Sequence, residues 1–329
     1  MNILVTGGAG YIGSHAVRHL IELGHQVVVL DNLSNGHREA ISPQATFREG
    51  SIADTKMVKD LLHGFSIEAV MNFAAFIEVG ESVADPYKYY ENNFGSTLSL
   101  LKVLVECGVK KFVFSSTAAV YGIPSEVPIP ETHSKSPLSP YGRSKLMVEE
   151  VLADFAKVHE LSYAVLRYFN VAGAHPDSSI GEDHRPETHL IPRILCSALD
   201  TAMTLSVYGT DYPTPDGTCI RDYVHVQDLV RAHSLALEHL KPGFTGAYNL
   251  GSQSGFSVLE VIEACKKITK KNFQIQNHPR REGDSPVLIA SSEKIKRELG
   301  WTPQYPALDT IIEHAWNWHR SHPQGYSTM

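Results

Sequence analysis

Tyr141 and Lys145 lie four residues apart, directly after Ser139 and Pro140. Serine is a favoured N-cap and proline a favoured first helical residue, so we predict a helix that begins here and carries both functional side chains on one face. An ammonium group beside a phenol favours the phenolate and lowers its pKa from about 10 toward neutrality. The pair indicates general acid–base chemistry, although a surface helix pair has the same spacing.

Three glycines, Gly7, Gly10 and Gly13, recur at every third position between an apolar run and an apparent helix. Such a turn lets the backbone approach a diphosphate, which then faces free N–H groups and the positive end of the helix dipole. Asp31 ends the next apolar run, where a carboxylate accepts hydrogen bonds from a ribose and repels a 2′-phosphate. These positions predict an NAD site rather than an NADP site; the alternative is a glycine-rich turn without a ligand.

Hydroxyl side chains end a third apolar run, at Ser115, Ser116 and Thr117. Side chains that leave the carboxyl edge of a parallel strand point into the crevice where such sheets bind ligands. One of these hydroxyls is therefore a candidate to share a substrate proton. The alternative is that they cap the next segment of the chain.

Short β-branched runs that alternate with helical stretches must position these residues. The runs span residues 3–6, 26–31, 69–74, 111–116 and 163–169. Continuous apolar strands separated by helices are typical of a parallel sheet covered on both faces, so we predict an α/β fold with a Rossmann-like, doubly wound sheet. We place this domain at residues 1–173, with a return of the chain near 224–251, and a smaller α/β substrate-binding domain at 174–329.

Composition limits the function classes. The 329 residues are 43% hydrophobic and carry a net charge of −7 without a basic tract, which is typical of a globular chain and argues against nucleic acid or membrane partners. No apolar run approaches the roughly 20 residues that cross a bilayer. The four cysteines are widely separated and indicate no disulfide framework. We therefore expect a cytoplasmic protein.

Beyond these patterns, the sequence resembles the UDP-hexose 4-epimerases, a group within the extended short-chain dehydrogenase/reductase family. The resemblance runs almost from end to end. It depends on the segments TGGAGYIGSH, LDNLSNG, NFAAF, VGES, SSTAAVYG, SPYGRSKLMVE, LRYFNVAGAHP, DGTCIRDYVHVQDL, PRREGD and HPQGY.

The resemblance implies reversible epimerisation of UDP-glucose and UDP-galactose at C4, through a 4-keto intermediate and with tightly bound NAD as a transient hydride acceptor. It also implies a homodimer. In this group Tyr141 and Lys145 would be the catalytic pair, with Thr117 as their hydroxyl partner. The implied cofactor contacts are Gly7, Gly10, Tyr11, Ile12, Gly13, Asp31, Asn32, Asn35, Phe73, Ala74, Ala75 and Asn93, together with Tyr141 and Lys145. The implied substrate contacts are Thr117, Asn170, His189, Tyr208, Arg221, Arg281, Asp284 and Leu288.

Several positions differ from the pattern of this group. Ser51 stands where an Asp often contacts adenine, Ile77 where a Lys is often found near the cofactor, and His189 where an Asn is common beside the diphosphate. Leu288 occupies the position whose side chain, in these enzymes, helps to determine whether an N-acetylated sugar fits. It is neither a large Tyr nor a very small residue, so acceptance of N-acetylhexosamines stays open.

Other features support weaker interpretations. His15 and His19 have the spacing of helical metal ligands, but without further placed ligands we expect no metal site. Arg280 and Arg281 also fit a solvated charge pair. A nucleotide-sugar 4,6-dehydratase would need an Asp-Glu pair after Thr117, where this chain has Ala118 and Ala119. A uronate-specific or decarboxylating epimerase, and a redox-sensing NAD binder without catalysis, are further alternatives.

Overall fold

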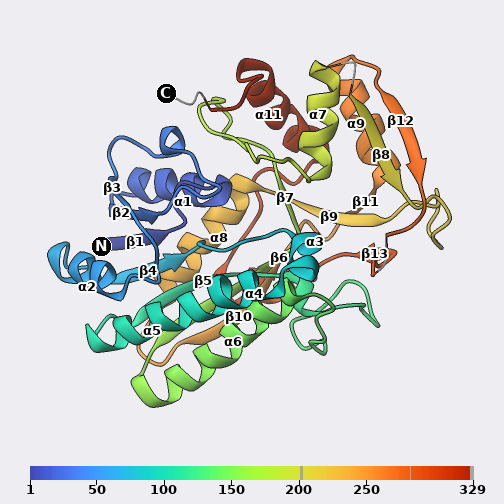
Figure 1. The fold of residues 1–329 in the computed structure, drawn as a ribbon. Coiled ribbons are helices and arrows are strands. Elements are labelled where there is room, and N and C mark those ends of the chain that lie inside the picture. Colours follow the sequence, from blue (N-terminus) through green and yellow to red (C-terminus); the bar gives the residue numbers. More distant parts are fainter. Residues whose placement is uncertain (201–202, 282, 327–329) are drawn as a thin grey trace.

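A seven-stranded parallel sheet organises most of the N-terminal half of the chain in the computed structural model, which describes residues 1–200, 203–281 and 283–326 (Figure 1). The expected α/β fold class is confirmed. The sheet order is β10 (Thr245–Leu250), β6 (Ser162–Tyr168), β5 (Lys111–Thr117), β4 (Ala69–Asn72), β1 (Asn2–Thr6), β2 (Gln26–Asp31) and β3 (Thr46–Glu49).

Helices cover both faces of this sheet, as its nearly continuous burial requires. On one face, α1 (Tyr11–Glu22), α8 (Val226–His239) and α10 (Glu293–Leu299) contribute to one apolar cluster with the strands. On the other face, α2 (Thr55–Gly64), α5 (Thr97–Glu106) and α6 (Pro140–His159) contribute to a second cluster. Figure 1 shows α5 and α6 side by side, below the sheet in that view.

The strands differ from expectation mainly at one edge. All five expected apolar runs form strands, and the chain returns after residue 224 as α8 and β10, beside β6. Strand β3 was missed because Thr46–Glu49 contains Phe47 as its single large apolar residue. An edge strand has one neighbour and needs less apolar surface than a central strand.

A second set of strands surrounds β9 (Ile220–His225). Strands β7 (Asn170–Ala172) and β13 (Val287–Leu288) pair with β9 in parallel, β11 (Gly255–Ser257) pairs with it antiparallel, and β8 (Thr204–Tyr208) pairs separately with β12 (Gln274–His278). Helices α7 (Leu190–Leu199), α9 (Val258–Thr269) and α11 (Leu308–Ser321) share an apolar core with these strands. In Figure 1 they lie together above β9.

Short helical elements occupy the connections near the carboxyl edge of the large sheet. They are η1 (Arg38–Ala40), α3 (Val79–Ala84), α4 (Pro86–Tyr89), the π-helix η2 (Tyr90–Ser96) and the 3₁₀ turn η3 (Ala118–Val120). Of the helices in the described ranges, none combines the length and the apolar character needed to cross a membrane.

Candidate active site

A cleft of about 380 Å³ opens at the carboxyl ends of the sheet strands. This is the edge where open parallel sheets bind ligands. Most of the expected site residues line it. They are Gly7, Gly10, Tyr11, Ile12, Gly13, Asp31, Asn32, Asn35, Phe73, Ala74, Ala75, Thr117, Tyr141, Lys145, Asn170 and His189, and the divergent Ser51 and Ile77 line it too.

The glycine turn between β1 and α1 fits a dinucleotide. Gly7 has a φ of +72°, and a Cβ at Gly7 would lie 2.5 Å from the backbone N of Ala74. A Cβ at Gly13 would lie 2.0 Å from the carbonyl oxygen of Gly7. The N-cap, Gly10, has no side chain to bond the first turn of α1, so the N–H groups of that turn are left for a ligand. The turn therefore has the form of a diphosphate cradle.

Asp31 fixes this turn from the end of β2. Its Oδ2 accepts the N–H of Ala9 at 2.9 Å and its Oδ1 accepts the N–H of Leu33 at 2.8 Å. The carboxylate is only 8% exposed, and burial raises its pKa despite these two hydrogen bonds. Because each oxygen has a further lone pair and Asp31 lines the cleft, the side chain suits a ribose diol.

Asn93 is the one expected cofactor residue that does not line the cleft among the described residues. It is buried in η2, where its amide bonds both the N–H of Phe76, at 2.8 Å, and the carbonyl of Phe76, at 2.9 Å. Phe76 lines the cleft. Asn93 therefore shapes the wall of the cleft through the backbone of Phe76. The sequence could not show this, because it depends on the π-helical turn.

The expected catalytic pair lies on α6, which begins as predicted. Ser139 caps the helix by accepting the N–H of Gly142 at 3.2 Å, and Pro140 follows as the first helical residue. Tyr141 is 9% exposed and Lys145 is 4% exposed, and both line the cleft. The surface-pair alternative is therefore wrong.

The pKa of Tyr141 differs from the sequence-based expectation. Burial raises it, a hydrogen bond with Thr117 lowers it, and the charge of Glu78 raises it further. Burial also lowers the pKa of Lys145 to about 7, opposed by the charge of Glu149. The hydrogen bond with Thr117 does not offset burial, and no lowering by the charge of Lys145 adds to it, so the expected net lowering is wrong.

Lys145 is held in place from β5. Its Nζ donates to the carbonyl of Ser115 at 2.9 Å and lies 5.0 Å from the centre of the Phe114 ring. The three strand-end hydroxyls have separate roles. Ser115 bonds Tyr168, Ser116 donates to the buried carboxylate of Glu149 at 2.7 Å, and Thr117 accepts the N–H of Ala119 at 3.1 Å. Ser115 and Thr117 line the cleft; Ser116 does not.

Five expected substrate residues form a second group outside the lining of the cleft. The Arg281 guanidinium lies 3.9 Å from the centre of the Tyr208 ring, and hydrogen bonding by Arg281 lowers the pKa of that phenol. Arg221 contacts Asp284 at 3.4 Å, and Leu288 pairs with Arg221 across β13 and β9. This group joins the cleft through β7, which carries Asn170 and pairs with β9.

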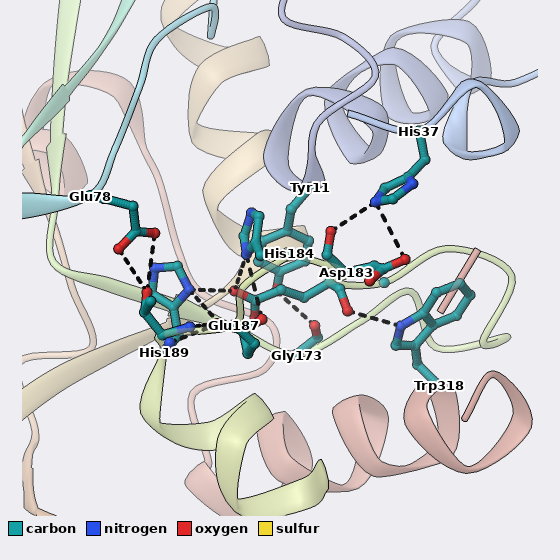
Figure 2. A network of polar contacts seen from close by, with 12 residues as sticks. Tyr11, His37, Glu78, Gly173, Asp183, His184, Glu187, His189 and Trp318 are labelled. Atoms are coloured by element: carbon teal, nitrogen blue, oxygen red, sulfur yellow. Dashed lines mark hydrogen bonds and ion pairs between the residues drawn. The ribbon is translucent and has the colours of Figure 1, made fainter. Parts of the chain in front are cut away.

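The sequence reasoning missed a polar cluster on the segment between β7 and α7. Glu182, His184, Glu187 and His189 lie together, and all except Glu187 line the cleft. Figure 2 shows His184, Glu187 and His189 on the side of Tyr11, which follows the glycine turn. Burial alone would lower the pKa of His184, but its contacts with Glu182 and Glu187 raise it to about 9. The recurrence of Glu and His in this segment is the sequence signal for the cluster, but of its four members only His189 is among the expected substrate contacts.

Other contacts tie this segment to the turn. The Tyr11 hydroxyl donates to the carbonyl of Gly173 at 2.7 Å, and His37 Nε2 lies 2.9 Å from the carbonyl oxygen of Asp183 (Figure 2). On the other side, the Thr188 hydroxyl donates to Glu78, in the turn before α3, at 2.9 Å. The segment therefore bridges two walls of the cleft.

Comparisons with known proteins agree with this geometry. Residues 3–251 match the NAD dependent epimerase/dehydratase family. The chain is 53% identical over its whole length to 98% of the UDP-glucose 4-epimerase of Halalkalibacterium halodurans.

Two solved structures have the same fold. The Brucella ovis UDP-glucose 4-epimerase in complex with NAD is 46% identical, with a TM-score of 0.93 over 96% of this chain and 97% of that one. The Bifidobacterium longum enzyme in complex with NAD⁺ and UDP is 38% identical, with a TM-score of 0.95 over 99% of this chain and 100% of that one. Because residues 3–251 match this family and the glycine turn has the close backbone approaches of a dinucleotide cradle, this chain belongs to the NAD-dependent epimerase/dehydratase family.

Proposed function

We propose that the chain catalyses the reversible epimerisation of UDP-glucose and UDP-galactose at C4, with NAD held in the cleft. The observation that best supports this proposal is that the glycine turn, Asp31 and the Tyr141–Lys145 pair line one cleft. Relatives that match the chain from end to end have this activity in their names, and solved relatives contain NAD with UDP or a UDP-sugar.

Tyr141 moves the proton in this reaction. Its phenol takes the proton of the 4-hydroxyl and later returns it, and the hydrogen bond with Thr117 stabilises the phenolate. Lys145 is fixed by the Ser115 carbonyl one helical turn from Tyr141 and supplies a basic group to the same cleft. When bound, NAD accepts a hydride from C4, which leaves a 4-keto sugar, and returns it to the opposite face.

The group around β9 holds the nucleotide part of the substrate. Arg221 and Arg281 supply guanidinium groups, whose planar forks suit a diphosphate, and Tyr208 supplies an aromatic face. The hexose must present both faces to the cofactor, so the binding energy has to come from the UDP part. This division explains why the charged side chains gather away from Tyr141.

The organisation of the chain follows from these assignments. We assign residues 1–173, with the return at 224–251, to NAD binding and 174–329 to UDP-sugar binding. The support is that the first group supplies all strands of the large sheet. We also propose a cytoplasmic homodimer. Val83 and Tyr87 on α3 and α4 are 64% and 70% exposed and offer apolar surface for a second copy. Light scattering during size-exclusion chromatography should give twice the chain mass; a monomer would contradict the dimer.

The function is tested by incubating the purified protein with UDP-galactose and no added cofactor. We expect UDP-glucose as the product and NAD in the supernatant after denaturation. A parallel incubation with UDP-N-acetylgalactosamine decides whether the chain, with Leu288 at this position, accepts an N-acetylated sugar. A solved relative from Campylobacter jejuni is named a UDP-Glc/GlcNAc 4-epimerase. Absence of UDP-glucose despite bound NAD would contradict the proposal and favour a binding protein without catalysis.

Two related activities have less support. A 4,6-dehydratase needs an ionisable group after Thr117, but Ala118 and Ala119 form η3 there. A uronate epimerase is separated from the proposed activity by an incubation with UDP-glucuronate, which we expect to remain unchanged.

A further inference from the structure

Four potential metal ligands converge on the segment between β7 and α7. Within residues 1–200, 203–281 and 283–326, one group of His, Cys, Asp and Glu side chains could hold a metal ion: Glu182, His184, Glu187 and His189, whose ligand atoms all lie within 4.8 Å of one another. The helical pair His15 and His19 lies outside this group. His15 is instead buried, with its Nδ1 bonded to the carbonyl of Tyr11 at 2.8 Å.

The distances between the two histidines and the two carboxylates are short enough for a shared ion. His184 Nδ1 lies 3.2 Å from Glu182 Oε1 and 3.5 Å from Glu187 Oε2. His189 Nδ1 lies 3.0 Å from Glu182 Oε1 and 2.9 Å from Glu187 Oε1. Bonds of about 2.0–2.1 Å from zinc to the corners of a tetrahedron put those corners about 3.3 Å apart. The four histidine–carboxylate distances, 2.9–3.5 Å, lie around this value, but Glu187 faces the two histidines with different oxygens. The four ligand atoms spread over up to 4.8 Å, so the cluster has to contract around an ion.

His184 Nδ1 is a buried nitrogen that lies near two carboxylates without a hydrogen bond to either. One oxygen of each carboxylate lies within 3.5 Å of it. A buried polar atom without a hydrogen bond is a feature expected where an ion is missing. The two carboxylate oxygens of Glu187 have different partners. Its Oε1 already accepts the N–H groups of Thr188 and His189 at 2.8 and 2.7 Å, whereas its Oε2 faces His184.

We propose that Glu182, His184, Glu187 and His189 bind one divalent transition-metal ion of the zinc class. Two imidazole nitrogens favour zinc, cobalt or nickel over magnesium or calcium, which prefer sites made of oxygen alone. Two carboxylates balance the charge of a divalent ion. Glu182 is only 4% exposed in its side chain and His189 is 40% exposed, so the site opens on the cleft through His189.

A bound ion would fix the segment over the cofactor cradle. Tyr11 and His37 already bond this segment from the glycine-turn side, and Thr188 bonds Glu78 on the opposite wall (Figure 2). Two of these contacts, at Asp183 and Thr188, lie within the stretch that Glu182 and His189 delimit. The ion therefore closes the stretch into a rigid loop, and a ligand bound only by the folded state stabilises it.

The test uses the purified protein with its own nucleotide, treated with a chelator and titrated with Co²⁺. We expect one Co²⁺ per chain, with the strong visible absorption of tetrahedral cobalt and a higher melting temperature. His184→Ala and Glu187→Gln should each weaken Co²⁺ binding by at least about 100-fold, since loss of even an outer-shell partner costs about 10–100-fold. His159→Ala, an exposed histidine at the end of α6, is the matched control and should bind Co²⁺ as the unmodified protein does.

Two results would overturn the proposal. One is the absence of stoichiometric Co²⁺ binding, and the other is unchanged affinity in both ligand variants. If either variant fails to fold, X-ray absorption of the zinc-loaded unmodified protein decides. Nitrogen and oxygen neighbours with two imidazole rings are expected, whereas a sulfur neighbour near about 2.3 Å would place the metal on a cysteine instead. None of these readouts depends on the proposed epimerase activity, so the two proposals fail separately.

Discussion

Lys145 lowers the stability of the folded protein at neutral pH, and replacing it should reveal by how much. Its ordinary pKa of 10.5 falls to about 7 because burial penalises the ammonium. At about 1.4 kcal/mol per pH unit, the difference corresponds to a cost of about 5 kcal/mol when the group is charged in both states. Lys145→Met keeps the length and apolar stem of the side chain and removes this cost.

The cost depends on pH in a defined direction. Below pH 7 the amine is protonated in the folded and unfolded states, so the full cost applies. Between pH 7 and 10.5 the unfolded chain binds more protons than the folded protein, so the stability of the unmodified protein rises with pH. The variant also loses the hydrogen bond to the Ser115 carbonyl, which contributes about 1.5–3 kcal/mol at every pH where the amine is charged.

We therefore expect Lys145→Met to be more stable than the unmodified protein at pH 6, by about 2–3 kcal/mol, and to lose most or all of that advantage by pH 9.5. The assay is urea unfolding of nucleotide-free protein at both pH values, because bound nucleotide would add its own stabilisation. Lys157→Met, on the exposed side of α6, is the control and should show no such change with pH. If the free energy of unfolding changed with pH by the same amount in Lys145→Met and in the unmodified protein, the reasoning would be refuted.

Three further changes test the cofactor cradle and the core beneath it. Asp31→Ser should reduce the preference for NAD over NADP, measured on the nucleotide released by denaturation, because the carboxylate no longer repels a 2′-phosphate. Gly13→Ala should abolish nucleotide retention, since its Cβ would lie 2.0 Å from the Gly7 carbonyl oxygen. Glu149→Gln should lower the free energy of unfolding in urea by about 3–5 kcal/mol, because it leaves the buried Arg167 guanidinium, 2.6 Å away, without a counter-charge.

Each of these expectations has a clear contrary result. An unchanged nucleotide preference in the Asp31 variant would show that selectivity comes from elsewhere in the cleft. Full NAD content in the Gly13 variant would show that the turn can move. A Glu149 variant as stable as the unmodified protein would show that Arg167 finds water or another acceptor.

The sequence predicted what short-range patterns determine. The cap at Ser139, the glycine turn and the strand-end position of Thr117 follow from local residue types, and the structure bears out each placement. Edge strand β3 escaped prediction because it buries little apolar surface. The lowered pKa expected for Tyr141 also failed, since burial is a tertiary property that no spacing reveals.

Parts of the site needed the fold. Asn93 acts through Phe76 because a π-helix turns its amide onto that backbone. Glu182 and His189 meet because the segment between them folds back on itself over the cradle. Both arrangements join residues whose chemistry was visible in the sequence but whose distances were not.

The central claim is that the phenol of Tyr141 moves the substrate proton beside bound NAD. The most direct measurement is the turnover of UDP-galactose by Tyr141→Phe, on protein whose NAD content and melting temperature match those of the unmodified enzyme. We predict that the turnover rate falls by about 10²–10⁴-fold or more, as is typical when a general base is removed. Turnover within a few-fold of the unmodified enzyme would contradict the account and move the proton transfer to another group.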